Sequence, residues 1–393
     1  MATVWILGAG FSKPLGGPLL KDLLWPEVLN KIATTYEEER FPKLRGGTVT
    51  SALWLYQFGT RFARGHGDLV KVQGAEEGAQ FWDNPEEYLD LLDVAAQDDS
   101  SRAAKLVSHS LRKYWGKALQ PISPDKLSAA ARRIVAAECS AFLEGIDLPS
   151  ERFLPYRRWA AELAQPGDSV ITFNYDRVIE RVGGDGGTRF VIPAPAQLAV
   201  QRDYPGRVIV YKLHGSVDWR WNRQEAQQDM QIVTADNERY ALDCEDSELA
   251  IASPGSQKLG MASRQLAPLW EAAMAAVSRA NNIVFVGYGF PQTDAFAKQK
   301  LIGAIRDNHE KLLNVHVVLG PDRGSTPVVR LEGMLRHALS ARLGRYSQRG
   351  IRTYELRTDY RYFDLRIHPL YAEDFFTVVE LPAIETPQDA NDF

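Results

Sequence analysis

The feature that most constrains the fold of this chain is an apolar segment at residues 3–7 that runs directly into Gly8-Ala9-Gly10-Phe11-Ser12. The segment is partly β-branched, a pattern typical of a buried parallel strand. The glycines allow a tight turn in which the backbone can approach a ligand without a Cβ in the way. Amides leading into a following helix would bind a diphosphate. An ordinary tight turn explains the pattern too, because Lys13 stands where the dinucleotide fingerprint has its third glycine.

The chain from residue 168 onwards alternates short apolar segments with helical patterns, as βα units do. Strands are predicted at 170–173, 208–213, 249–252, 283–287, 315–319, 351–356 and 375–379. Helices are predicted at 176–182, 264–280, 294–306 and 328–343. We therefore predict an α/β fold with a doubly wound (Rossmann-like) parallel sheet.

The region between the first strand and residue 166 is mostly helical in pattern. Asn84-Pro85-Glu86-Glu87 and Ser123-Pro124 each place a capping residue before a proline, as at a helix start, and a further helix is predicted at 51–63. We predict a large helical insertion after the first strand. The predicted domains are a discontinuous core at 1–18 and 166–380, the insertion at 19–165 and a loose C-terminal tail at 381–393.

Composition excludes several classes of protein. The net charge of −4 argues against a strongly basic nucleic-acid surface, so direct nucleic-acid binding is not expected. Cys139 and Cys244 are too few for a disulfide framework or a four-thiolate zinc site, and we expect no metal. No apolar run approaches the roughly 20 residues needed to cross a bilayer. The N-terminal residues do not resemble a signal peptide, so we expect a cytoplasmic location without membrane attachment.

Four predicted strands end in residues that apolar packing does not require. Beside the first glycine segment, these ends are Thr172-Phe173-Asn174-Tyr175-Asp176, Lys212-Leu213-His214-Gly215-Ser216 and Val286-Gly287-Tyr288-Gly289-Phe290. Because parallel strands end on one edge of a sheet, the four segments should converge on one crevice. From the residues alone, Asn174 could instead cap a helix, Asp176 could be a first-turn acid and His214 could be a turn histidine. The glycines at 287 and 289 could mark only a close backbone crossing.

Taken in this order, the four segments resemble the sirtuin superfamily, and most closely the sirtuin-like proteins of bacterial antiviral defence. The resemblance covers the residues outside the helical insertion. It implies that Gly8, Ala9, Gly10 and Phe11 form the diphosphate loop, that Ser12 donates a hydrogen bond there, and that Gly287, Tyr288 and Gly289 line the adenosine half. It also implies that Asn174 lies beside the nicotinamide ribose, that Asp176 is the family's aspartate and that His214 is its general base.

The chain departs from the family's pattern in places. Phe173 replaces the usual glutamine, Gly289 replaces the usual serine, and no cysteine follows His214 in the paired spacing of the zinc ribbon found in protein deacylases. Asp294 follows the last turn and either holds the adenine-side ribose or begins a helix. Without the ribbon, water is the simplest acceptor for the activated ribose.

The resemblance therefore implies an NAD+ glycohydrolase that releases nicotinamide and ADP-ribose, with NAD as substrate and no metal. It implies an NAD-depleting effector of antiphage defence that forms a homo-oligomer or acts with a separate partner, such as a HerA-type ATPase or an Argonaute. Two alternatives remain open: a protein ADP-ribosyltransferase or deacylase, and a non-catalytic NAD or ADP-ribose sensor that scaffolds a partner.

Overall fold

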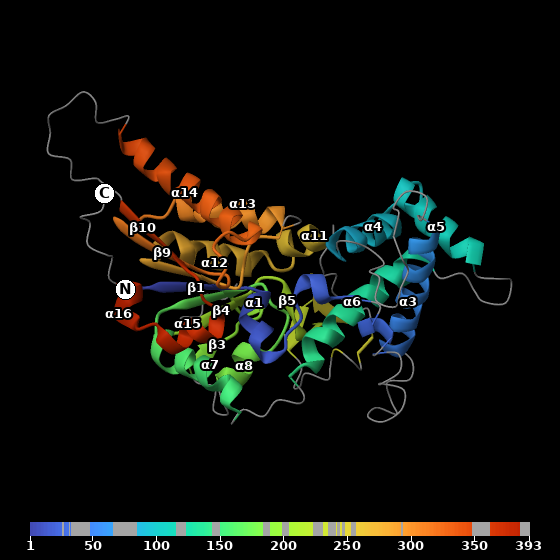
Figure 1. Ribbon diagram of the computed structural model, residues 1–393, viewed down its shortest axis with the longest axis horizontal. Coiled ribbons are helices and arrows are strands. Elements are labelled where there is room, and N and C mark those ends of the chain that lie inside the picture. The colour runs from blue at the N-terminus through green and yellow to red at the C-terminus, as the bar shows by residue number, and fades with distance from the viewer. Residues whose placement is uncertain are drawn as a thin grey trace. The chain divides into compact units, whose positions relative to one another are not determined.

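A computed structural model gives the fold of the chain (Figure 1). It describes residues 1–25, 27–30, 32, 48–65, 85–114, 123–143, 150–183, 189–198, 204–222, 231–234, 241, 244–245, 248–252, 257–291, 294–347 and 362–385. The chain divides into two compact units, the first made of residues 1–16, 146–213 and 265–393 and the second of residues 17–145 and 214–264. The domain boundaries expected from the sequence stay a prediction.

The first unit is built around a seven-stranded sheet in the order β10-β9-β8-β1-β2-β4-β3, in which every neighbouring pair is parallel. Its strands are β1 (Thr3–Leu7), β2 (Ser169–Thr172), β3 (Phe190–Val191), β4 (Val208–Lys212), β8 (Asn282–Val286), β9 (Leu312–Val318) and β10 (Tyr362–His368). The central strand β1 is buried along its whole length, and Leu7 pairs with Thr172 of β2 and with Val286 of β8. The predicted doubly wound α/β fold is confirmed.

Helices cover both faces of this sheet (Figure 1). One layer holds α9 (Pro195–Leu198), α12 (Ala267–Arg279), α13 (Ala295–Arg306) and α14 (Thr326–Ser347). On the other face, α1 (Ala9–Ser12) and α7 (Leu154–Arg158) pack against α15 (Ala372–Val378). Shorter elements are η1 (Lys13–Leu15), η3 (Glu151–Phe153), the π-helix η4 (Trp159–Leu163), α8 (Val178–Val182) and α16 (Leu381–Glu385).

Two predictions for the C-terminal region are wrong. Residues 375–379, predicted as a strand, lie mostly in α15, where the buried residues Ala372, Phe375, Phe376 and Val379 follow helical rather than alternating spacing. Residues 381–385, predicted as part of a loose tail, form α16, and Ile384 is fully buried. The predicted strand at 351–356 and residues 386–393 lie outside the described residues.

The second unit combines helices with a small antiparallel sheet of order β6-β5-β7. The strands are β5 (Gly215–Asn222), β6 (Gln231–Thr234) and β7 (Leu249–Ile251), so the strand predicted at 249–252 exists but belongs to this sheet. The helical elements are η2 (Leu20–Asp22), α3 (Thr48–Gly65), α4 (Pro85–Gln97), α5 (Arg102–Tyr114), α6 (Pro124–Ala141) and α11 (Gln257–Ser263). The predicted cap Ser123 accepts a hydrogen bond from the Lys126 amide at 3.4 Å; the other predicted cap, Asn84, lies outside the described residues.

Candidate functional site

The strand order of the first unit places a topological switch at β1. From β1 the chain continues to β2 and β4 on one side, and it later returns to β8, β9 and β10 on the other side. Open α/β sheets bind ligands outside the carboxyl ends of the strands at such a reversal. The segments at this position follow β1, β2 and β8, and they contain most of the residues singled out in the sequence.

The segment Gly8–Ser12, here called the β1 loop, crosses closely over the segment that follows β8. The Gly8 amide donates to the Val286 carbonyl at 3.0 Å, and the Gly10 amide donates to the Gly287 carbonyl at 3.1 Å. A Cβ on Gly8 would lie 2.6 Å from the Gly287 oxygen, and a Cβ on Gly287, which has a φ of +68°, would overlap the β1 loop backbone. The close crossing of two main chains therefore explains these glycines without a ligand. Their predicted role in binding a diphosphate stays a prediction.

Several amides of the β1 loop that are predicted to bind a diphosphate already have hydrogen-bond partners within the protein. Besides Gly8 and Gly10, the Phe11 amide donates to the Gly8 carbonyl at 2.8 Å. An anionic ligand at this loop would therefore have to rely on other donors. Ser12 is 1% exposed, and its single hydroxyl proton is already donated to Asp176 Oδ2 at 2.6 Å. Its predicted hydrogen bond to a diphosphate stays a prediction.

Ser12 joins the β1 loop to the segment after β2. Its hydroxyl donates to Asp176 Oδ2 at 2.6 Å and accepts from Asn174 Nδ2 at 3.0 Å. Asn174 Nδ2 also donates to the Gly8 carbonyl at 3.0 Å. Four of the predicted site residues, Gly8, Ser12, Asn174 and Asp176, are thus linked by direct hydrogen bonds. The contacts show that Asn174 holds the β1 loop against β2, whatever else it does.

Asp176 is held at three atoms. Besides the bond from Ser12, Oδ1 accepts from the Val178 amide at 3.0 Å at the start of α8, and the main-chain oxygen accepts from Lys212 Nζ at 2.6 Å. Lys212 Nζ also donates to Glu180 Oε1 at 2.7 Å. Burial raises the pKa of Asp176, while the Ser12 hydrogen bond and the positive charge of Lys212 act against that increase.

Two stacked rings come from the segments that follow β2 and β8. Phe173 follows β2 and Tyr288 follows β8; their ring centroids are 4.0 Å apart and their planes differ by 9°. The pair is here called the aromatic bridge. A Cβ on Gly8 would lie 2.8 Å from the Tyr288 Cβ, so Tyr288 is next to the β1 loop. Tyr288 Oη donates to Asp294 Oδ2 at 3.1 Å.

The outer part of the segment after β8 is packed against the helices. Asp294 is 3% exposed and stands at the N-terminus of α13, where its side chain makes no capping hydrogen bond. The Gly289 carbonyl accepts from Arg330 Nη2 of α14 at 2.8 Å, and a Cβ on Gly289 would lie 3.1 Å from Pro327 Cβ. Phe290 has a φ of +51°, a left-handed conformation that is strained for a large side chain. Phe290 follows Gly289, and so comes soon after Tyr288 of the aromatic bridge.

His214 belongs to the second unit and is the first residue of that unit's second segment, 214–264. It follows the end of β4 by two residues and is 4% exposed, and its carbonyl accepts from the Ala252 amide at 2.8 Å. Gly215 next to it has a φ of +79°, and a Cβ there would overlap the Ala250 carbonyl of β7. The role of His214 as a general base stays a prediction.

Sequence reasoning missed two residues that support the site. Tyr156 of α7 is fully buried and donates its hydroxyl to the Phe11 carbonyl at 2.7 Å. Nothing local in the sequence signals this role, because Tyr156 lies almost 150 residues from the loop that it contacts. Lys212 is the second residue, and its signal was readable: a cation ends an otherwise apolar strand.

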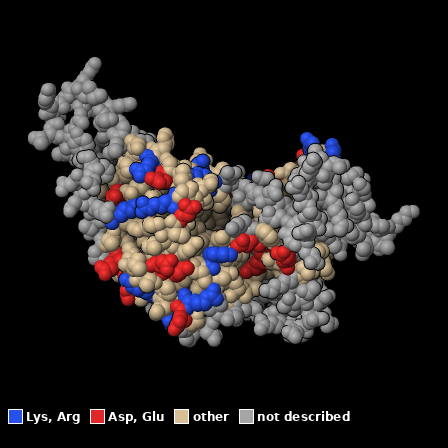
Figure 2. Space-filling view, viewed as in Figure 1, with Lys and Arg blue, Asp and Glu red and all other residues tan. Residues whose placement is uncertain are grey.

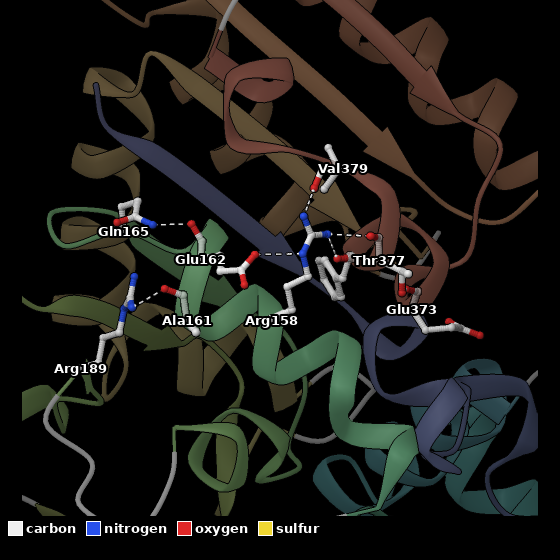
Figure 3. A network of polar contacts seen from close by, with 9 residues as sticks. Arg158, Ala161, Glu162, Gln165, Arg189, Glu373, Thr377 and Val379 are labelled. Carbon is white, nitrogen blue, oxygen red and sulfur yellow. Dashed lines mark hydrogen bonds and ion pairs between the residues drawn. The ribbon is translucent and has the colours of Figure 1, made fainter.

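A polar network holds the elements beneath the β1 loop together (Figure 3). Arg158 at the end of α7 donates to the Thr377 and Val379 carbonyls at 2.8 and 2.9 Å, and to Glu162 Oε2 at 3.0 Å. Arg189 donates to the Ala161 carbonyl at 2.6 Å (Figure 3). The bonds of Arg158 fix α7 to the end of α15, and the bond of Arg189 fixes η4 to the residue before β3. The aromatic rings of Phe11, Tyr156, Trp159 and Phe376 pack together within this part of the unit.

Part of the chain matches a known protein family. Residues 168–327 match the family described as a SIR2-like domain, which supports membership of the sirtuin superfamily. SIR2-like domains bind NAD, so the match indicates an NAD-related activity in general. The matched range includes Asn174, Asp176 and His214 but not the β1 loop, whose place in the site rests on its contacts. None of the curated proteins compared with the chain matches it.

Among the described residues, no group of three or more His, Cys, Asp or Glu side chains could hold a metal ion, and the buried residues Cys139 and Cys244 form no disulfide. In the same part of the chain, no helix combines the length and the apolar character that a membrane span requires.

Proposed function

We propose that this chain is an NAD+ glycohydrolase that cleaves NAD to nicotinamide and ADP-ribose. The observation that carries the proposal is the hydrogen-bonded group of Asn174, Ser12 and Asp176. It lies at the carboxyl ends of β1 and β2, where open α/β sheets bind nucleotides. The match of residues 168–327 to a SIR2-like domain supports an NAD ligand at this position.

The proposed chemistry needs oxygens near the ribose and a base for water. Nicotinamide leaves as a neutral molecule from a cationic substrate, and the ribose passes through an oxocarbenium-like state. Asn174 Nδ2 already makes two hydrogen bonds, so a ribose hydroxyl or the attacking water would donate to its carbonyl oxygen. Asp176 supplies negative charge nearby. We assign the base to His214, because an imidazole can take a proton from water near neutral pH.

The biological part of the proposal rests on the resemblance to sirtuin-like defence proteins. A cell that hydrolyses its own NAD must keep the enzyme inactive until infection, so we propose an antiphage effector in the cytoplasm. It would act as a homo-oligomer or with a separate partner such as a HerA-type ATPase or an Argonaute. Direct binding of nucleic acid by this chain is not part of the proposal.

The test is the release of nicotinamide from NAD by the purified chain, with and without candidate partners, followed by chromatography. Asn174→Ala and His214→Ala should each lower the rate by at least about two orders of magnitude. The matched control is Asn308→Ala. Asn308 is fully buried and its Nδ2 donates to the Val277 and Ala280 carbonyls at 2.8 and 2.9 Å, so it loses comparable bonds away from the site.

The outcomes separate the candidate functions. Wild-type rates in both Asn174→Ala and His214→Ala would end the site assignment, as would an equal loss in Asn308→Ala. Modified protein in place of free ADP-ribose would identify a transferase or deacylase. Binding of NAD without turnover would identify a sensor, and Asn174→Ala would then change the affinity and not a rate.

A further inference from the structure

Lys212 is a buried cation that the proposed chemistry does not use. It is the last residue of β4, and its side chain is 0% exposed. Removal of an ammonium group from water costs several kcal/mol, and an apolar side chain of similar size often gives equal or greater stability than a buried ion pair. A lysine at this position therefore indicates a requirement other than stability.

The contacts of Lys212 indicate what that requirement is. Lys212 pairs with Thr172 in the register of β4 and β2, so it reaches the segment after β2 from the neighbouring strand. Its ammonium group bonds the Asp176 carbonyl at 2.6 Å and is balanced by Glu180 at 2.7 Å. Ser12 bonds the carboxylate of Asp176 at 2.6 Å. Asp176 is thus held between β4 and the β1 loop.

We propose that Lys212 is a positioning residue of the candidate site, which holds the Asp176 main chain so that the Asp176 carboxylate keeps the Ser12 hydroxyl and the β1 loop in place. The proposal rests on the proposed function, since it concerns the same site. A buried positive charge beside a carboxylate also favours the ionised form of that carboxylate. Loss of the charge should therefore alter how Asp176 titrates, which a purely structural role would not do.

The chain offers a control for the loss of a cation with similar partners, Arg366, whose side chain is 15% exposed whereas that of Lys212 is 0% exposed. Arg366 of β10 donates to Asp364 Oδ2 at 2.7 Å and to the Ala383 carbonyl at 2.7 Å. It therefore has the same two kinds of partner, a carboxylate and a main-chain carbonyl, at the opposite side of the sheet. Lys212→Met and Arg366→Met remove equivalent interactions, only one of which touches the site. Lys212→Arg keeps the charge and serves as the conservative variant.

The decisive measurement is the titration of the Asp176 carboxyl group by carbon-13 NMR, with its resonance assigned by its loss in Asp176→Asn. Lys212→Met should raise the titration midpoint of Asp176, while Lys212→Arg should stay closer to the wild type and Arg366→Met should match it. Turnover of NAD is measured beside it. Lys212→Met should lower kcat/KM by about tenfold to a hundredfold, because small misplacements of site groups are costly. The acid limb of the pH profile of kcat/KM for Lys212→Met should move to higher pH.

The outcomes distinguish failure of the Lys212 proposal from failure of the proposed function. An unchanged Asp176 midpoint in Lys212→Met overturns the proposal, as does an equal shift in Arg366→Met or a wild-type kcat/KM in folded Lys212→Met. A wild-type protein that does not cleave NAD defeats the proposed function, while the carboxyl titration still decides whether Lys212 acts on Asp176. If Lys212→Met does not fold, Lys212→Gln replaces it, because glutamine keeps a donor without the charge and should give the same upward shift.

Discussion

At the residue scale, the candidate site is held by buried hydroxyl groups, two of which join segments distant in the chain. Ser12 links the β1 loop to Asp176, Tyr156 links α7 to Phe11, and Tyr288 links the segment after β8 to Asp294. Each of these three residues is buried. A buried hydrogen-bond partner is costly to leave unpaired. Single hydroxyl deletions therefore test this arrangement with little change in side-chain volume.

Tyr156→Phe should lower the free energy of unfolding by about 1–3 kcal/mol, because the variant leaves the Phe11 carbonyl without its donor at 2.7 Å. Denaturant unfolding measures the change. Tyr371→Phe is the control, since Tyr371 is 55% exposed and should behave like the wild type. An unfolding curve of Tyr156→Phe that overlays the wild type would contradict the assigned bond.

Glu138 of α6 gives a pH-dependent prediction for the second unit. Burial raises its pKa to about 8, against the effect of a hydrogen bond from the Leu24 amide. The folded chain therefore keeps Glu138 protonated where the unfolded chain ionises it. The stability that this residue contributes is present below about pH 4.3 and is lost as the pH rises through about 8.

Glu138→Gln, which resembles the protonated form, should melt at a higher temperature than the wild type at pH 8, and the difference should shrink towards pH 5. Thermal unfolding monitored by circular dichroism between pH 5 and 8 measures this. Glu271→Gln, at an exposed position of α12, should give a pH-independent difference. A constant difference in Glu138→Gln would be evidence against a raised pKa.

At the scale of elements, the sequence predicted regular elements better than those fixed by distant contacts. The alternation of apolar segments and helical patterns predicted β1, β2, β4, β8 and β9 because each is an apolar run between turn signals. It missed β10, whose residues include Asp364, Arg366 and His368. It placed residues 375–379 in a strand because Phe375 and Phe376 are adjacent, although the next buried residue falls at helical spacing.

The docking of α16 could not be predicted from local pattern either. The carbonyls of its last residues are bound by side chains of the sheet: Arg366 donates to Ala383 at 2.7 Å and Asn314 to Glu385 at 3.2 Å. His316 Nε2 lies 3.3 Å from the Ile384 carbonyl, and its Nδ1 lies 2.9 Å from His368 Nε2. The short distance between His316 Nδ1 and His368 Nε2 requires a proton between these two nitrogens. Two neutral rings can therefore make both the contact between the rings and the contact with the Ile384 carbonyl.

Acid should destabilise this part of the first unit. Burial lowers the pKa of His316 and of His368, and the charge of Arg366 adds to the effect on both, with Arg323 also acting on His368. The unfolded chain takes up protons below about pH 6.5 whereas the folded pair does not. The stability from the pair is therefore present above about pH 6.5 and lost as the pH falls towards the lowered pKa values.

Denaturation midpoints at pH 7 and pH 5 measure this loss. The double variant His316→Gln/His368→Gln should lose less stability between the two pH values than the wild type, since it lacks the titrating rings. His309→Gln, at an exposed position, should lose as much as the wild type. An equal loss in the double variant would show that the pair does not account for the acid sensitivity.

At the scale of the whole molecule, the sequence predicted which strand ends meet but not what holds them. The order of βα units was enough to bring Gly8–Ser12, Asn174 and Asp176 together, because parallel strands share an edge. The glycines at 8, 10 and 287 fit either a diphosphate loop or a tight turn and close backbone crossing, and the contact of two main chains already requires them. Tyr156 contacts a loop 145 residues away, and such a contact depends on tertiary packing that no local pattern encodes, whereas the cation at the end of β4 was visible in the sequence.

The aromatic bridge has a consequence for the speed of ligand capture. Phe173 and Tyr288 are 6% and 4% exposed, and their ring centroids are 4.0 Å apart. If the proposed nucleotide reaches the β1 loop between these rings, they have to separate before it binds. Binding that needs such a rearrangement is slower than diffusion allows. In stopped-flow mixing with ADP-ribose, the observed rate should level off at high ligand concentration.

Phe173→Ala should raise that plateau, while Phe296→Ala, whose ring packs on Trp270 of α12, should leave it in place. A rate that climbs in proportion to ADP-ribose over the whole range would mean that the rings do not have to part. A plateau would mean that the separation of these two rings, and not diffusion, limits the rate at which the ligand binds. Any change that loosens the contact between the rings would then speed up binding.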